Sequence, residues 1–172
     1  MRLRKFNESQ ESDLDKYINA CKFLGDNKEI LMNEVDYLHN IFLDLKETYN
    51  IHMEAHKPGF DKGDYSIGMS LNPDTKDFGW DTWKHTKVEF IPKLMIALKR
   101  VYNRYPICSI RIIGSDSESW HLTMSKEMLN SDKLSTFNKI PEFLNKLSYG
   151  PRMVYVMVKF EDIINGHMSQ YR

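Results

Sequence analysis

Two histidines and a glutamate alternate along one short segment of the chain. His52, Glu54 and His56 lie two residues apart, so on a β-strand both imidazoles and the carboxylate share one face. Two histidines and a carboxylate are a ligand set that suits zinc or non-haem iron. A straight strand spreads them over about 13 Å, so a metal site would need them to converge or to use a further ligand. The alternative is a solvated polar face opposite the apolar Met53 and Ala55.

A further histidine lies on a second predicted strand, where Trp120, Leu122 and Met124 alternate with His121 and Thr123. The His-x-Thr pattern resembles one half of the signature of the two-histidine phosphoesterases. That resemblance implies two such motifs facing one cleft, in which the histidines exchange a proton during cleavage of a 2′,3′-cyclic or 2′–5′ phosphodiester. The hydroxyl residues would hold the phosphate.

The second motif of such an enzyme would have to come from His52 and Glu54. Glu54 departs from the family pattern, because a carboxylate repels a phosphodiester instead of holding it. The resemblance therefore implies His52, His121 and Thr123 as catalytic residues. The alternative is that all three occupy the polar faces of ordinary strands.

Three large aromatic residues gather in residues 72–85, a segment without clear periodicity that is predicted to be a long surface loop. Exposed tryptophan is costly unless it packs or binds, and tryptophan with a charged rim is typical of hot spots in protein interfaces. The alternative is that Trp80 or Trp83 folds back over the core. The candidate binding residues of this segment are Phe78, Trp80, Asp81, Trp83 and His85.

Other catalytic chemistry finds no support in the sequence. No glycine-rich segment joins a strand to a helix with the spacing of a nucleotide-binding loop, and no Ser-His-Asp arrangement is evident. Cys21 and Cys108 both lie in apolar patterns, which predicts buried, reduced thiols and not a disulfide framework or a zinc ribbon. We therefore expect no cofactor.

The charge balance bears on the class of partner. The 172 residues include 24 Lys and Arg and 24 Asp and Glu, so the formal net charge is zero. A zero net charge argues against a nucleic-acid partner. No apolar run approaches the roughly 20 residues that a transmembrane helix needs, and the first residues do not form a signal peptide, so we expect a cytoplasmic protein that does not use a membrane.

The hydrophobic periodicity predicts the elements that position these residues. Helical spacing continues from Leu14 to Leu24 and again from Leu31 to Leu45. Two hairpins follow, each with strands that alternate apolar and polar residues. The predicted order is a helix over 14–24, a longer helix ending near 48, strands over 51–56 and 65–71, a helix from 86 to 105, strands over 108–112 and 120–124, helical segments within 128–147 and a strand over 153–160.

This order predicts a single α+β domain with a mostly antiparallel sheet of about five strands, helices packed on one face, and an N-terminal helical pair. Residues 1–48 would form the helical N-terminal part, residues 49–164 the hairpin-helix-hairpin-helix-strand part, and residues 165–172 a loose tail. The last strand is apolar on both faces, which predicts a central position in the sheet.

The third helix is the least regular of the predicted elements. Pro92 would lie in its first turns or kink it, because proline cannot donate a hydrogen bond in a helix interior. The residues predicted to form its buried stripe are Val88, Ile91, Met95, Leu98 and Tyr102.

Together these features favour a small, non-catalytic cytoplasmic protein that binds and modulates another macromolecule, most plausibly a protein. In style the chain resembles small phage accessory proteins that inhibit or redirect a host component. The competing hypothesis is an enzyme, either a phosphodiesterase or a metal-dependent enzyme, built on the histidine strands. A concave surface shared by those polar side chains would favour the enzyme, whereas exposed aromatics on an open face would favour the binding protein.

Overall fold

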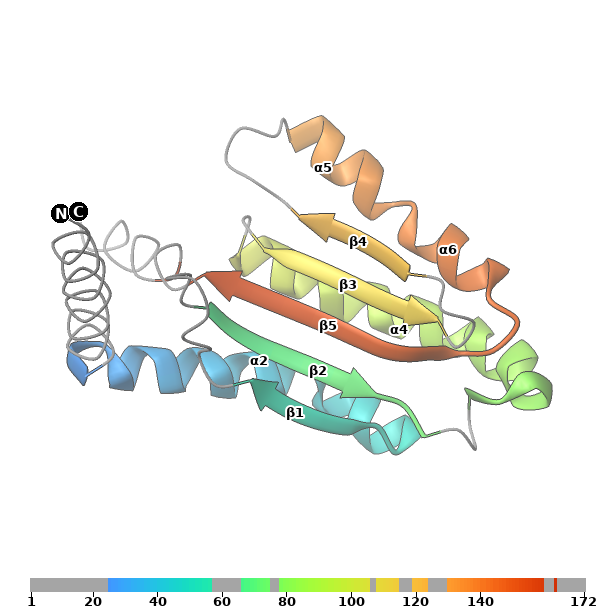
Figure 1. The fold of residues 1–172 in the computed structure, drawn as a ribbon, viewed down its shortest axis with the longest axis horizontal. Coiled ribbons are helices and arrows are strands. Elements are labelled where there is room, and N and C mark those ends of the chain that lie inside the picture. Colours follow the sequence, from blue (N-terminus) through green and yellow to red (C-terminus); the bar gives the residue numbers. More distant parts are fainter. Residues whose placement is uncertain are drawn as a thin grey trace, which may run out of the picture.

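The computed structural model describes residues 25–56, 66–74, 78–105, 108–114, 119–123, 130–159 and 163. Figure 1 shows the arrangement of the helices and strands. Within the described ranges, every helix is too short or too polar to cross a bilayer. The elements are α2 (Lys28–Tyr49), β1 (His52–His56), β2 (Ser66–Asn72), α4 (Trp80–Arg104), β3 (Ser109–Gly114), β4 (Ser119–Thr123), α5 (Asn130–Phe137), α6 (Ile140–Lys146) and β5 (Pro151–Lys159).

The five strands form one antiparallel sheet in the order β1-β2-β5-β3-β4. The two predicted hairpins are therefore confirmed, and β5, the last strand in the chain, lies between them (Figure 1). The predicted α+β fold, with a central final strand, is also confirmed. The helix expected over residues 14–24 and the tail over 165–172 lie outside the described residues.

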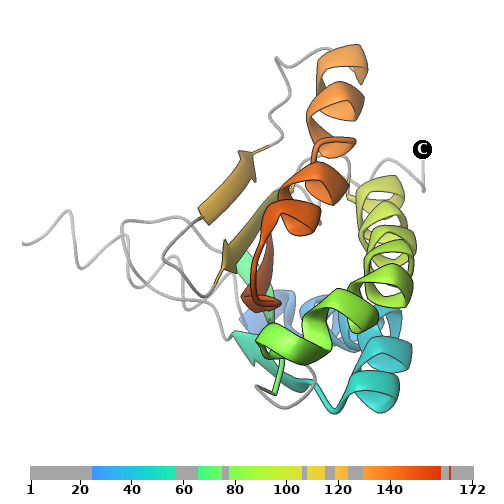
Figure 2. The same ribbon diagram turned by 90° about the vertical axis from the view of Figure 1, so that its right-hand side faces the viewer.

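One face of the sheet is apolar and is covered by α2, α4, α5 and α6, which lie on the same side of it in Figure 2. On the central strand β5, Val154, Val156 and Val158 are fully buried. The register pairs Val156 with Ile110 of β3 and with Met69 of β2, so apolar rows cross the sheet from strand to strand. Burial of these rows against α2 and α4 forms the core.

Helix α4 begins earlier than the sequence predicts. It starts at Trp80 after Gly79, so Trp80, Asp81, Trp83 and His85 lie in its first turns and not in a loop. Asp81 in the first turn favours this start, because a carboxylate interacts well with the positive end of the helix dipole. The helix continues through Pro92, and Figure 2 shows its green N-terminal part and its yellow-green C-terminal part running in different directions.

The buried stripe of α4 also differs from the predicted one. Val88 is 71% exposed, and Met95 and Tyr102 are only partly buried. Ile91 and Leu98 are buried as predicted. Positions three or four residues apart, counted from Trp83, identify the buried face of α4 correctly. A helix predicted to start at residue 86 does not contain Trp83, so this face is not recognised. The buried residues of α4 are Trp83, Phe90, Ile91, Leu94, Ala97, Leu98 and Val101.

A buried carboxylate links α2 to the C-terminal end of α4. Glu34 is only 2% exposed. Arg104 donates to it from Nε at 3.0 Å and from Nη2 at 2.5 Å, and the Tyr105 hydroxyl donates a third hydrogen bond. The Arg104 guanidinium also lies 4.3 Å from the ring centre of Tyr37. These contacts satisfy the buried charge, so removal of Glu34 would leave a cation and a hydroxyl without their acceptor.

We predict that Glu34→Ala lowers the free energy of unfolding by about 2–3 kcal/mol, below the usual cost of breaking a fully buried pair because Arg104 is partly exposed. Glu47→Ala, at an exposed position of the same helix, should change it by less than about 0.5 kcal/mol. Urea titrations of both variants measure the difference. Equal stability of the two variants would contradict the structural role of Glu34.

The same cluster predicts a loss of stability at alkaline pH. Burial, and then the hydrogen bond to Glu34, raises the pKa of the Tyr105 hydroxyl above its ordinary value. Below pH about 10 both folded and unfolded chains keep this proton, whereas above it only the unfolded chain releases it, so the free energy of unfolding falls as pH rises. Thermal melts between pH 8 and 11 should show a flatter pH dependence for Tyr105→Phe than for the unmodified chain. Identical slopes would mean that Tyr105 does not contribute.

Candidate functional site

The predicted catalytic histidines lie at opposite edges of the sheet. His52 is on β1 and His121 is on β4, which are the first and last strands in the spatial order (Figure 1). The register runs from Glu54 through Ser70, Tyr155 and Arg111 to His121, so these positions share the face of the sheet that points away from the helices. The common face agrees with the sequence analysis, but four spacings of about 4.8 Å separate the two edges by about 19 Å.

This separation contradicts a shared phosphodiesterase site. A general acid and a general base must each come within about 3 Å of the group that they serve. His52 and His121 therefore cannot act on one phosphate in this arrangement. The side chain of Thr123, the third predicted catalytic residue, lies outside the described residues.

His121 and His52 each have a local polar environment. The Nε2 atom of His121 lies 2.9 Å from Oγ of Ser109, and both side chains are on the outer face of the sheet. His52 lines a polar hollow of about 510 Å³ at the other edge, together with Lys46 and Asp74. Each environment fits a solvated strand face.

The predicted metal set is only partly described. His52 and Glu54 are exposed, whereas the side chain of His56 lies outside the described residues. Among the side chains that the structure places, no three His, Cys, Asp or Glu residues are grouped closely enough to hold a metal ion. Cys108 is buried, as predicted, and Cys21 is outside the described part.

The five predicted binding residues divide into two groups. Phe78 and Trp83 are buried, so the prediction that they form an exposed binding loop is wrong. Phe78 packs against Tyr49 and Phe90, and Trp83 packs against Phe90. The rings of Phe78 and Trp83 stack with centroids 5.7 Å apart. The expectation that one tryptophan covers the core is confirmed for Trp83, which is fully buried.

The other three predicted residues, Trp80, Asp81 and His85, remain exposed. Trp80 is 49% exposed, and its ring centroid is 5.5 Å from that of Tyr149, which is 38% exposed. The Nζ atom of Lys84 lies 5.4 Å from the centre of the Trp80 ring. We call Trp80, Lys84 and Tyr149 the aromatic corner. The sequence analysis missed Tyr149. Its position directly before Gly150-Pro151, two residues typical of turns, was the available signal for an aromatic side chain at the surface.

Two hydrogen bonds fix the segments that carry the aromatic corner. The amide of Gly150 donates to the carbonyl of Phe78 at 2.8 Å, and Nε1 of Trp83 donates to the carbonyl of Leu147 at 3.2 Å. Gly150 is required there, because a Cβ atom at this position would lie 2.3 Å from the Phe78 ring. The turn after α6 is therefore joined to the start of α4.

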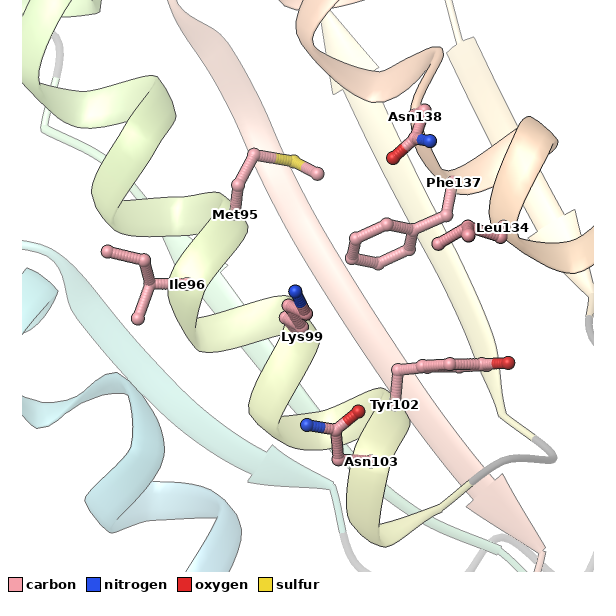
Figure 3. A pocket seen from close by; sticks show the side chains of 8 residues that line it. All are labelled: Met95, Ile96, Lys99, Tyr102, Asn103, Leu134, Phe137 and Asn138. Carbon is pink, nitrogen blue, oxygen red and sulfur yellow. The ribbon is translucent and has the colours of Figure 1, made fainter.

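An apolar groove of about 230 Å³ lies between α4 and α5. Figure 3 shows Met95 and Tyr102 of α4 pointing toward Leu134 and Phe137 of α5. Leu134 is 51% exposed, and the rings of Tyr102 and Phe137 are 6.1 Å apart. Ile96, Lys99, Asn103 and Asn138 complete the lining. The sequence analysis missed this site because it assigned Met95 and Tyr102 to the core.

The groove and the aromatic corner lie at two ends of one boundary between α4 and the α5–α6 segment. Trp80 contacts Tyr149, Nζ of Lys87 donates to the carbonyl of Asn145 at 3.2 Å, and Tyr102 contacts Phe137. Residue numbers rise along α4 while they fall along its neighbour, so the two segments run antiparallel. We call this boundary the α4 seam. It carries exposed apolar groups at both ends.

Comparisons of the chain with protein-family models, with curated proteins and with solved structures find no match. Within the described residues, the candidate site comprises two exposed aromatic rings on a fixed support and one apolar groove.

We predict that substitution of the two tryptophans of α4 lowers stability by very different amounts. Trp83→Ala should lower the free energy of unfolding by about 3–5 kcal/mol, because it empties a fully buried site. Trp80→Ala should cost less than about 1 kcal/mol, because half of its surface is already in water. Chemical denaturation of both variants measures the contrast. A large loss in Trp80→Ala would show that the aromatic corner is part of the core.

Proposed function

We propose that this chain is a non-catalytic cytoplasmic protein that acts by binding another protein, and that the aromatic corner is its main contact. The observation that carries the proposal is the exposed pair of Trp80 and Tyr149, with the Lys84 ammonium beside the Trp80 ring. Tryptophan and tyrosine are enriched among the few residues that supply most of the binding energy in protein interfaces.

The support beneath the aromatic corner strengthens the proposal. Hydrogen bonds from Gly150 to Phe78 and from Trp83 to Leu147 join the two backbone segments that hold the exposed rings. A contact surface that is already ordered before binding loses less conformational entropy when the partner arrives. The two rings can then contribute to affinity with little reorganisation.

The placement of the histidines favours this function over the enzyme. A phosphodiesterase would need His52 and His121 on one phosphate, whereas they belong to opposite edges of the sheet. Balanced overall charge argues in the same direction, because it favours a protein over a nucleic acid as partner.

The test uses the intact chain to capture proteins from a lysate of the cells in which it is made, followed by mass spectrometry. We expect one protein to be enriched, and its recovery to fall at least tenfold with Trp80→Ala, in line with loss of about 2 kcal/mol at an aromatic hot spot. Val88→Ala is the matched control, because it truncates another exposed apolar residue of α4. Its recovery should stay unchanged.

Thermal melts of both variants accompany the capture, so that a folding defect is recognised. Equal recovery with Trp80→Ala and the unmodified chain would overturn the role of the aromatic corner. Failure to enrich any protein, together with turnover of a phosphodiester by the unmodified chain, would favour the enzyme instead.

A further inference from the structure

Helix α4 carries a strong positive charge in a chain whose net charge is zero. Its 25 residues include six Lys and Arg and only two acidic residues, Asp81 and Glu89. The partner of Arg104 is Glu34, whereas the part of the groove lining that the structure describes contains no carboxylate. Helix α4 is therefore a basic element, with four more positive than negative side chains, in a chain that is electrically balanced.

Three lysines of α4 lie along the seam. Lys84 is beside the Trp80 ring, Lys87 donates to the carbonyl of Asn145, and Lys99 lies at the margin of the groove (Figure 3). Among the described residues that line the groove, Lys99 is the one that carries a charge. A partner that fills the groove would thus place its flanking residues in a field that favours carboxylates.

The groove itself favours apolar side chains. Met95, Tyr102, Leu134 and Phe137 form its walls, and half of the Leu134 surface is exposed. Methionine adapts its shape easily, which suits a surface that accepts a side chain from another molecule. Burial of the exposed part of Leu134 would add hydrophobic stabilisation to a complex.

We propose that the groove of the α4 seam binds the apolar face of an acidic amphipathic helix from a partner protein. Apolar residues of that helix, three or four positions apart, enter between Met95 and Leu134, and a carboxylate next to them pairs with Lys99. The proposal rests on the proposed function, because it names the chemistry of the partner that the aromatic corner would also contact.

A helix fits this place better than a strand or a nucleic acid. The groove is bounded by two helices, α4 and α5, and side chains of a third helix can pack between their ridges. Strand addition requires an open sheet edge, which the groove does not contain. The phosphates of a nucleic acid would pair with the lysines, but they would not bury the apolar walls of the groove.

The test selects random 16-residue peptides, displayed on phage, against the full chain. We expect the enriched peptides to be acidic and to repeat Leu, Ile or Phe at positions i, i+4 and i+7. The strongest binder is then synthesised, and its Kd is measured by fluorescence anisotropy. Leu134→Glu should raise that Kd at least tenfold, because it places a carboxylate in the apolar wall.

Two further variants make the test specific. Lys99→Glu should raise the Kd of the acidic peptide at least fivefold. It should also reverse the preference, so that a basic version of the same peptide binds more tightly than the acidic one. Val88→Glu adds the same charge to an exposed position of α4 outside the groove lining, and it should leave Kd within twofold. Thermal melts identify any variant that fails to fold, in which case Leu134→Gln replaces Leu134→Glu.

Several results would overturn the proposal. These are enrichment of basic peptides, absence of any enriched peptide, or binding that Leu134→Glu and Lys99→Glu leave unchanged. Self-association of the chain in sedimentation, lost in Leu134→Glu, would assign the groove to a second copy instead. If the peptide fails but Trp80→Ala still abolishes capture from the lysate, the proposed function stands without the groove.

Discussion

Trp83 is fully buried, and its indole N–H has one polar partner, the carbonyl of Leu147. A large aromatic side chain in this position fixes both the rotation of α4 about its axis and its distance from the turn after α6. Because Trp83 faces inward, Trp80, three residues earlier, is turned toward the rim and meets Tyr149. The exposed aromatic corner therefore depends on the burial of its neighbour.

The opposite end of α4 is held by a different kind of interaction. There Glu34 of α2 accepts hydrogen bonds from Arg104 and Tyr105, and Arg104 lies over the ring of Tyr37. Aromatic packing at one end, and at the other an ion pair between buried Glu34 and partly exposed Arg104, fix the helix relative to the sheet. The contacts at its two ends therefore determine which side of α4, from Trp80 to Tyr102, faces the solvent.

Much of the fold follows from local patterns in the sequence. Alternation along Ile110 and Ile112 is sufficient to identify β3, and the continuous apolar run from Met153 to Val158 is sufficient to identify β5 as a central strand. The stripe of α2 is predicted equally well, since Leu38, Phe42 and Leu45 repeat at helical spacing and are buried. The segment predicted as one broken helix or two short ones forms two helices, α5 and α6, and Pro141 lies in the first turn of α6, where proline is common.

The site is harder to predict, because it depends on contacts between distant residues. Glu34 and Arg104 are 70 positions apart, and nothing local to either residue indicates the other. The predicted start of α4 is six residues late, so Trp83 is left out of the predicted helix and Val88 is wrongly assigned to its buried face. The same predicted face includes Met95 and Tyr102, which line the groove. The order of the strands also depends on contacts between distant residues. Alternation predicts that His52 and His121 lie on polar strand faces, but only the order of the five strands shows that they are at opposite edges of the sheet.

The central claim is that the aromatic corner rests on a support that is ordered before any partner binds. Native-state hydrogen exchange of the Gly150 amide tests it most directly, because this amide donates to the carbonyl of Phe78 across the joint between the two segments. The account predicts that it exchanges slowly, with a protection close to that of the amides in the central strand β5. Exchange at the rate of an unprotected loop amide would contradict it.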